Sequence, residues 1–98
     1  MSRAPVQHCQ LCARAMRLEF HHLIPRKVHR RAYFARRYDR EELRSRGIWL
    51  CRLCHRFLHR QFDEVTLGRH YATLEAVLAS EAVQRHVNWA ARQRPDKR

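Results

Sequence analysis

The sequence predicts a single small α+β domain, residues 1–98, whose fold is reinforced by bound metal. Two Cys-x-x-Cys dyads stand far apart in the chain, and a pair of histidines follows each dyad. At 98 residues an apolar core alone is only marginally sufficient, so a structural metal is a plausible reinforcement. The side chains that carry this prediction are Cys9, Cys12, Cys51, Cys54, His21, His22, His55 and His59.

The four cysteines have the spacing of a closed zinc site. Each Cys-x-x-Cys turns tightly, so two sulfurs can face one ion while backbone amides donate to them. Two such turns complete a tetrahedron with Zn–S distances of about 2.3 Å. The alternative is two separate sites that each combine a dyad with its neighbouring histidines. This alternative is disfavoured because Cys54 and His55 are adjacent in the chain, and adjacent side chains do not easily coordinate the same ion.

The histidines suggest a second, more open site. An extended strand would place His21 and His22 on opposite faces, so the two cannot both be ordinary ligands of one ion. A helix would place His55 and His59 on one face, with Cβ atoms about 5–6 Å apart. One strand histidine with the two helix histidines, taken as His21, His55 and His59, leaves coordination positions open, as in a catalytic site. The other strand histidine could then act as a base toward water.

Short secondary-structure elements are expected around these ligands. Residues 18–24 are compatible with a strand that Pro25 ends, and residues 48–50 form a short apolar strand. The basic stretch 26–38 reads as a loop or short helix. Residues 55–62 have helical spacing.

Capping residues and helical periodicity together predict three further helices. Asp39 and Glu42 form a capping-box pattern that opens a short helix, and Gly47 is expected to close it. Ser80 is the expected N-cap between two later helical patterns. These patterns cover residues 66–79 and 81–93, within a C-terminal extension (66–93) that packs on the core or mediates dimerisation. The apolar residues expected in its core are Leu74, Val77, Leu78, Val83 and Val87.

Charge points to nucleic acid as the partner. The chain has 21 Lys and Arg against 9 Asp and Glu, a formal net charge of +12, and nearly all of the basic residues are arginines. Arginine binds phosphate bidentately and stacks on bases. Any one of these residues could equally be a solvated surface charge. The candidates for phosphate contact are Arg26, Lys27, Arg30, Arg31, Arg52, Arg56 and Arg60.

Membrane insertion and export are not expected. No apolar run approaches the roughly 20 residues that span a bilayer, and the N-terminus lacks the apolar segment of a signal peptide. A cytoplasmic location is therefore expected, where cysteines are metal ligands more often than disulfides.

The motifs together resemble a known family. Glu19-Phe20-His21-His22, followed by Pro25 and by His55-Arg56-Phe57-Leu58-His59, is similar to the motif of HNH nucleases, which have the treble-clef-like ββα-metal fold. The spacing resembles that of the colicin DNases. The flanking cysteine dyads resemble those of zinc-stapled HNH endonucleases from bacteria and phages. The resemblance covers about residues 8–62, the expected nuclease core, and implies a metal-dependent endonuclease acting on DNA, most simply double-stranded.

The resemblance also implies roles. His22 matches the general base that deprotonates water, and Glu19 matches an acidic residue that helps to orient an arginine near the phosphate. His21, His55 and His59 match the ligands of one divalent ion (Mg²⁺, Mn²⁺, Ni²⁺ or Zn²⁺). The four cysteines match ligands of a structural Zn²⁺.

One departure from the family keeps alternatives open. Arg46 stands where the family has the asparagine that braces the loop holding the base, so backbone bonds would have to supply the brace. The first alternative is a non-catalytic, zinc-containing nucleic-acid-binding module on an HNH-derived scaffold. The second is a zinc-dependent protein-interaction domain, which the charge of +12 opposes. Monomer and homodimer are equally compatible with the sequence.

Overall fold

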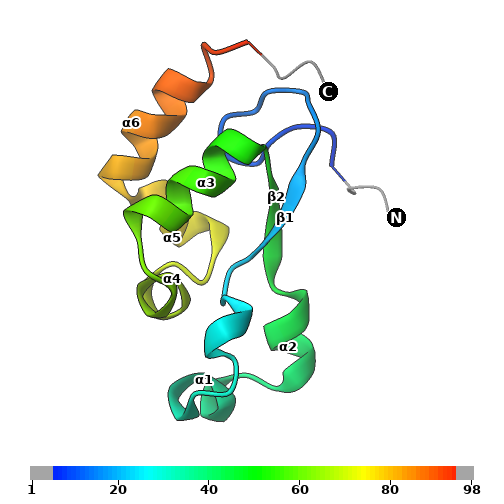
Figure 1. Cartoon of the computed structure of the whole chain (residues 1–98), viewed down its shortest axis with the longest axis vertical. Helices are drawn as coiled ribbons and strands as arrows, with labels where there is room; N and C mark the ends of the chain where they lie inside the picture. Colours follow the sequence, from blue (N-terminus) through cyan, green and yellow to red (C-terminus); the bar gives the residue numbers. More distant parts are fainter. Residues whose placement is uncertain (1–5, 95–98) are drawn as a thin grey trace.

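A two-stranded antiparallel sheet runs through the middle of the molecule and joins its two ends (Figure 1). The computed structural model describes residues 6–94, within overall extents of 41 × 33 × 19 Å. Strands β1 (Glu19–His22) and β2 (Gly47–Leu50) pair so that Glu19 lies opposite Leu50 and His22 lies opposite Gly47. The predicted α+β class and both predicted strands are confirmed.

Helix α3 (Arg52–Gln61) follows β2 directly and packs against the sheet. The alternation of a strand sends Ile48 and Leu50 of β2 into the core, together with His21 of β1. Leu58 of α3 is fully buried in the same core. This strand–strand–helix order brings the predicted histidine segments together.

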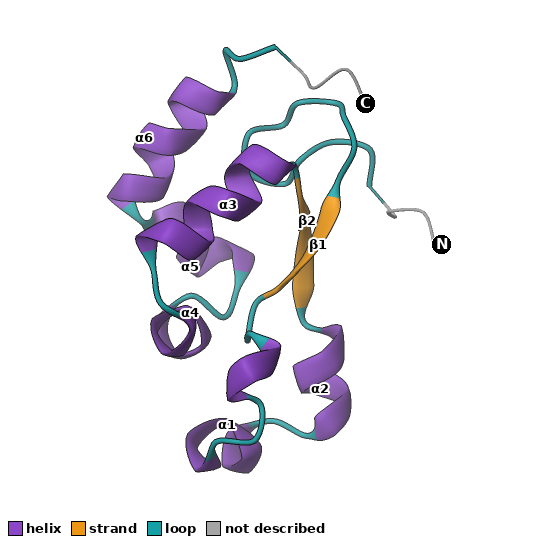
Figure 2. Ribbon diagram, in the orientation of Figure 1, coloured by secondary structure: helices purple, strands orange, loops and turns teal. Residues whose placement is uncertain are grey.

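The long connection between the strands forms one end of the molecule. It contains the 3₁₀ helix η1 (Arg26–Val28) and the helices α1 (Ala32–Arg37) and α2 (Arg40–Ser45), drawn at the bottom of Figure 2. The capping box of α2 is present, since Asp39 accepts from the Glu42 amide and Glu42 accepts from the Asp39 amide. The residues of this connection enclose a small core of their own, which consists of Ile24, Val28, Phe34 and Leu43.

The prediction for Gly47 is wrong. Helix α2 ends at Ser45 with Arg46 as its C-cap, and Gly47 is the first residue of β2, with no positive φ angle. Glycine is needed there because the ring of Phe20 occupies the space that a Cβ atom would take.

The helix expected over residues 66–79 is two helices. Asp63 caps α4 (Glu64–His70), and Thr73 caps α5 (Leu74–Ala79) by accepting from the Ala76 amide. Between them Tyr71 leaves the helical conformation and its ring packs on Phe62, 4.2 Å away between centroids. The aromatic contact and the second cap break the periodic pattern.

The last helix, α6 (Glu81–Ala90), begins at Ser80 as predicted, and the Ser80 hydroxyl accepts from the Val83 amide. It packs beside α3 and α5, which confirms that the C-terminal extension lies on the core. Val77 and Val83 are fully buried, but Leu78 is exposed and does not belong to the core. Within the described residues, no helix combines the length and apolar character needed to cross a membrane.

The ends of the chain are described only in part. The expected N-terminal arm, residues 1–8, lies mostly outside the described residues, although His8 forms a bridge with Ala15. Residues 95–98 of the expected tail also lie outside them.

Candidate metal centres and basic surface

The four cysteines form one buried cluster. Their sulfur atoms all lie within 4.8 Å of one another, and the Sγ atoms of Cys12 and Cys51 are 3.8 Å apart. The amides of Leu11 and Cys12 donate to the Cys9 sulfur, and the Cys54 amide donates to the Cys51 sulfur, each at 3.4 Å. Cys51 is also the N-cap of α3, so the second dyad is the first turn of that helix. Such a cluster can bind a structural metal such as zinc.

The protonation of these thiols favours a bound cation. Hydrogen bonds from Cys51 and Cys54 lower the pKa of Cys9 to about 3. Hydrogen bonds with Cys51 and Cys9, together with burial, raise the pKa of Cys54 above its usual value. The surroundings thus favour the thiolate of Cys9 and the protonated thiol of Cys54. Four thiolates so close together require a positive charge among them, and a divalent metal supplies it.

A buried arginine, which no sequence motif indicated, supports the same cluster. The Arg14 guanidinium donates to the sulfurs of Cys12 and Cys51, both at 3.2 Å. It also donates to the carbonyls of Gln93 and Arg94, just beyond α6. Burial acts against its charge, but the bonds to the two sulfurs raise the pKa of Arg14 above its usual value. Arg14 therefore ties the cysteine cluster to the C-terminal helix.

His21, His55 and His59 form a second cluster between β1 and α3. One ring nitrogen of each lies within 4.8 Å of the others, and the ring centroids are 5.0–5.3 Å apart. His21 is fully buried, and neither of its ring nitrogens has a hydrogen-bond partner among the described residues. A buried polar group without a partner is costly, and a metal ion would satisfy it. These three residues therefore fit a metal ion, and they are the three that the sequence selected.

Two histidines of this cluster have a lowered pKa, which favours the neutral form that binds metal. Burial, followed by the charges of His55 and His59, lowers the pKa of His21 to about 3. Burial also lowers the pKa of His59. These two rings therefore favour presenting a lone pair rather than a positive charge.

Glu19 fixes the orientation of one of these rings. The Nδ1 atom of His55 donates to Glu19 Oε1 at 2.8 Å, which leaves Nε2 of His55 as the free acceptor. The other carboxylate oxygen lies 3.7 Å from Nε of Arg52. Glu19 therefore contacts both an arginine and a histidine, and its shorter contact is with the histidine of the cluster.

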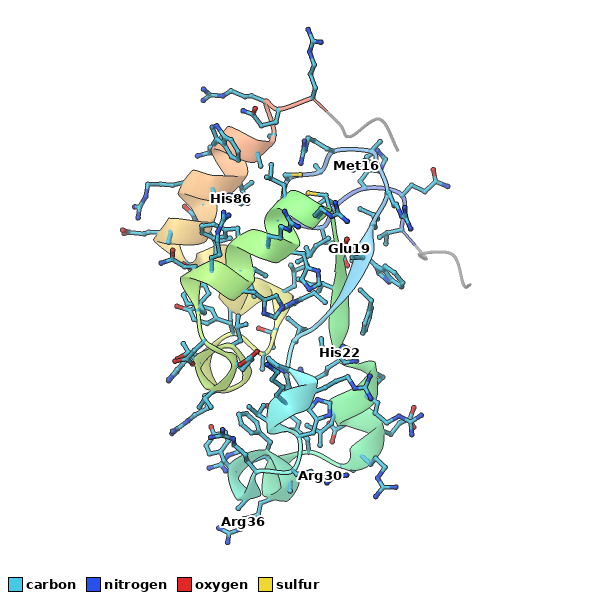
Figure 3. All side chains as sticks on the ribbon, viewed as in Figure 1. Met16, Glu19, His22, Arg30, Arg36 and His86 are labelled. Carbon is cyan, nitrogen blue, oxygen red and sulfur yellow. The ribbon has the colours of Figure 1, made fainter. Side chains whose placement is uncertain are left out.

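His22 lies at the end of β1 (Figure 3). Because side chains alternate along a strand, it is on the face opposite to that of His21. It is half-buried; its ring packs edge-on against Phe20 at 4.9 Å and lies 6.2 Å from His29. Burial, followed by the charges of His29 and Arg26, lowers the pKa of His22.

A backbone bond braces the segment after His22. The Leu23 amide donates to the Arg46 carbonyl at 3.1 Å, and the Arg46 side chain donates to the Ala72 carbonyl. Position 46, where the asparagine is absent, thus still holds the loop, but through its main chain.

The predicted phosphate ligands gather around two hollows. Arg56 and Arg60 line a cavity of about 500 Å³ together with His55 and His59. A groove of about 1310 Å³ lies along η1, α1 and α2. Its basic and histidine lining consists of His22, Arg26, Lys27, His29, Arg30, Arg40 and Arg44. The sequence had not selected His29, Arg40 or Arg44.

The other two candidates, Arg52 and Arg31, are placed differently, and Lys27 of the groove also has an acidic neighbour. Arg52 pairs with Glu19 and borders a third hollow beside Arg56. Lys27 lies 3.7 Å from Glu64. Arg31 precedes α1 and lines none of these three hollows.

Comparison of the chain with protein-family models, curated proteins and solved structures finds no match. The fold and the two clusters define a small α+β protein with a four-cysteine site that can bind zinc. Membership of the HNH family stays a prediction from the motif.

Proposed function

We propose that the protein is a metal-dependent endonuclease that hydrolyses DNA phosphodiester bonds. The observation that carries the proposal is the convergence of His21, His55 and His59, with both nitrogens of the buried His21 unpartnered among the described residues. Three imidazoles leave coordination positions for substrate, whereas the four-cysteine cluster is closed. The arginines beside the histidines supply the charge that a phosphodiester requires.

In this proposal His21, His55 and His59 would hold one divalent ion, Mg²⁺, Mn²⁺, Ni²⁺ or Zn²⁺. Such an ion would supply the positive charge that stabilises the negative charge developing on the phosphodiester during hydrolysis. Glu19 keeps His55 in the tautomer that offers Nε2. Arg56 donates to phosphate oxygens and positions the substrate.

His22 is the proposed general base. Because its pKa is lowered, the ring is neutral at pH 7 and can accept a proton from an attacking water. The groove that His22 lines is bordered by Arg26, Lys27 and Arg30, which would hold the DNA backbone. The Leu23–Arg46 backbone bond supports this assignment, because it holds the base in place without the family's asparagine.

The cysteine cluster has a structural role in the proposal. It fixes the start of α3 beside the sheet, since Cys51 caps that helix and Cys54 directly precedes His55. Bound zinc would therefore set the distance between the helix histidines and His21.

The test is plasmid nicking by purified protein across a series of added divalent metals. We expect the wild type to nick and His22→Ala to be inactive, with unchanged zinc content. The matched control is His70→Ala, which removes an exposed histidine outside both clusters and should nick normally. Equal nicking by His22→Ala would remove His22 from its proposed role.

A second function is favoured by one observation, the arginine at position 46. If no metal supports nicking but the protein binds DNA, the fold is a non-catalytic nucleic-acid-binding module. Metal content measured on the same preparation separates the two cases further. The nuclease requires a second ion in addition to the structural zinc, and the module does not.

A further inference from the structure

We propose that Trp89 and the arginines around it form a binding site for an unpaired nucleobase, so that the favoured substrate is DNA with a single-stranded segment. This inference rests on the proposed nuclease function and names its substrate class. It is carried by an exposed aromatic side chain, a basic hollow beside it, and a row of arginines that leads from this hollow to the histidines.

Trp89 is unusually accessible for its size. It lies in the last turn of α6 and is 51% exposed. Among residues 6–94, only Leu78 shares the combination of a large apolar side chain and an exposed surface. A single exposed apolar residue is common and would not by itself indicate a site.

The second observation is the hollow that Trp89 borders. It has a volume of about 340 Å³, near the lower end of the range of roughly 300–1,000 Å³ that ligand pockets occupy. None of the described residues that line it is acidic. They are Arg14, Arg52, Leu53, Arg56, Trp89, Gln93 and Arg94. An aromatic face among arginines matches a base attached to a phosphate backbone.

The hollow has a rigid support. His86 lies on α6 (Figure 3). Its ring stacks on Phe57 of α3, with centroids 4.1 Å apart and planes 8° from parallel, and the centroid of the Trp89 ring is 5.8 Å away. Arg14 holds the chain just beyond α6 through the Gln93 and Arg94 carbonyls. Because α6 packs on α3 and the chain just beyond α6 is bonded to Arg14, little backbone entropy would be lost when a ligand binds at Trp89.

The hollow and the cavity of the proposed active site share one lining residue. Arg56 lines both this hollow and the cavity of His55 and His59. Arg52, Arg56 and Arg60 follow each other at i,i+4 spacing on α3, with a rise of about 6 Å per step. A strand whose phosphates follow this row would pass from Trp89 to the histidine cavity.

The preference for an unpaired strand follows from stacking. In a duplex both faces of each base are covered by neighbouring bases, so a protein aromatic ring can stack only on a base that is unstacked. Stacking on Trp89 is therefore possible at an overhang, gap or flap, and not within an intact duplex.

The first experiment uses the fact that the chain has two tryptophans. In Trp49→Phe the emission comes from Trp89 alone, and in Trp89→Phe it comes from Trp49 alone. We expect oligothymidylate to quench Trp49→Phe strongly and Trp89→Phe weakly, and we expect duplex DNA to quench neither strongly. Absence of quenching in Trp49→Phe while the oligonucleotide is bound would overturn the inference.

The second experiment measures affinity by fluorescence anisotropy without added divalent metal. We expect Trp89→Ala to bind labelled oligothymidylate about ten-fold more weakly, the typical loss for one stacked base, and to bind duplex as the wild type does. Leu78→Ala is the matched control, since it removes the other exposed apolar side chain. If Trp89→Ala lost equal affinity for duplex and single-stranded DNA, or lost none for either, the result would count against the nucleobase site.

The two proposals can fail separately. If plasmid is nicked but Trp89 does not respond to single strands, the nuclease stands and the nucleobase site falls. If Trp89 responds but no metal supports cleavage, the site stands on a binding module. If the protein binds no DNA, both proposals fall.

Discussion

Replacing Glu19 by glutamine should weaken the histidine site without affecting the cysteine site. The carboxylate accepts from Nδ1 of His55 at 2.8 Å, and this bond fixes the tautomer in which Nε2 is free to bind a metal. Loss of such a partner typically costs about 10–100-fold in metal affinity, or about 1.4–2.8 kcal/mol. The Glu19 side chain is 40% exposed, and glutamine keeps an oxygen that can accept. We therefore expect Glu19→Gln to bind metal at the histidine site about ten-fold more weakly than the wild type. Glu19→Ala should lose more affinity, because it keeps no acceptor.

The assay is calorimetric titration of Zn²⁺ into protein that already carries one equivalent of zinc. The cysteine cluster fills first because thiolates bind zinc more strongly than imidazoles, so the titration reports the histidine site. Co²⁺ provides a check, because thiolate-bound cobalt has an absorption band that should be the same in wild type and variant.

Glu64→Gln is the matched control. Its carboxylate acts on His59 through charge and lies 3.7 Å from Lys27, but it forms no hydrogen bond with a histidine of the described chain. We expect the zinc affinity of the histidine site to change by less than about three-fold in Glu64→Gln, as for the loss of an exposed charge. If Glu64→Gln lost as much affinity as Glu19→Gln, net charge would explain both. If Glu19→Gln lost none, the hydrogen bond would not support the site.

Three further changes test the fold around the sites. Gly68→Ala should gain about 1 kcal/mol in helix propensity, but its Cβ would lie 2.8 Å from two atoms of the buried Phe34 ring, an overlap that costs about 1–3 kcal/mol. We therefore expect a lower melting temperature that Phe34→Leu partly restores, and a higher one would contradict this packing. Arg14→Met should lower the melting temperature and speed the transfer of zinc to a chelator, because two N–H···S bonds are lost; an unchanged transfer rate would separate Arg14 from the metal site. Burial lowers the pKa of His86 in the fold, so as pH falls below 6.5 the unfolded chain takes up the proton first and the wild type loses stability relative to His86→Phe. Denaturant unfolding at several pH values measures the difference in unfolding free energy between wild type and His86→Phe. A difference that does not change with pH would refute the lowered pKa of His86.

Caps and turns were readable from the sequence because their bonds close within a few residues. Asp39 accepts from the Glu42 amide and Ser80 from the Val83 amide, as predicted. The helix over residues 66–79 was mispredicted because its break depends on Tyr71 packing on Phe62, a contact outside the periodic pattern. The role of Gly47 was mispredicted for the same reason. A Cβ atom at this position would overlap the ring of Phe20 on the neighbouring strand, and this contact is not local in the sequence.

The types and spacing of the metal donors were also determined locally. The i,i+3 spacing of each cysteine dyad and the i,i+4 spacing of His55 and His59 fix which atoms can share an ion. The pairing of β1 with β2, and the packing of α3 on the sheet, then decided that His21 meets the helix histidines.

The partners of these donors were decided by tertiary structure alone. Arg14 reaches Cys51 and the Gln93 carbonyl, and Glu19 reaches His55, across long stretches of chain. The hollow at Trp89 exists because α6 packs along α3. The sequence specifies which chemical groups are present and which near neighbours they can reach. Contacts between distant segments depend on how all of the intervening elements pack together. A local sequence pattern therefore does not predict them.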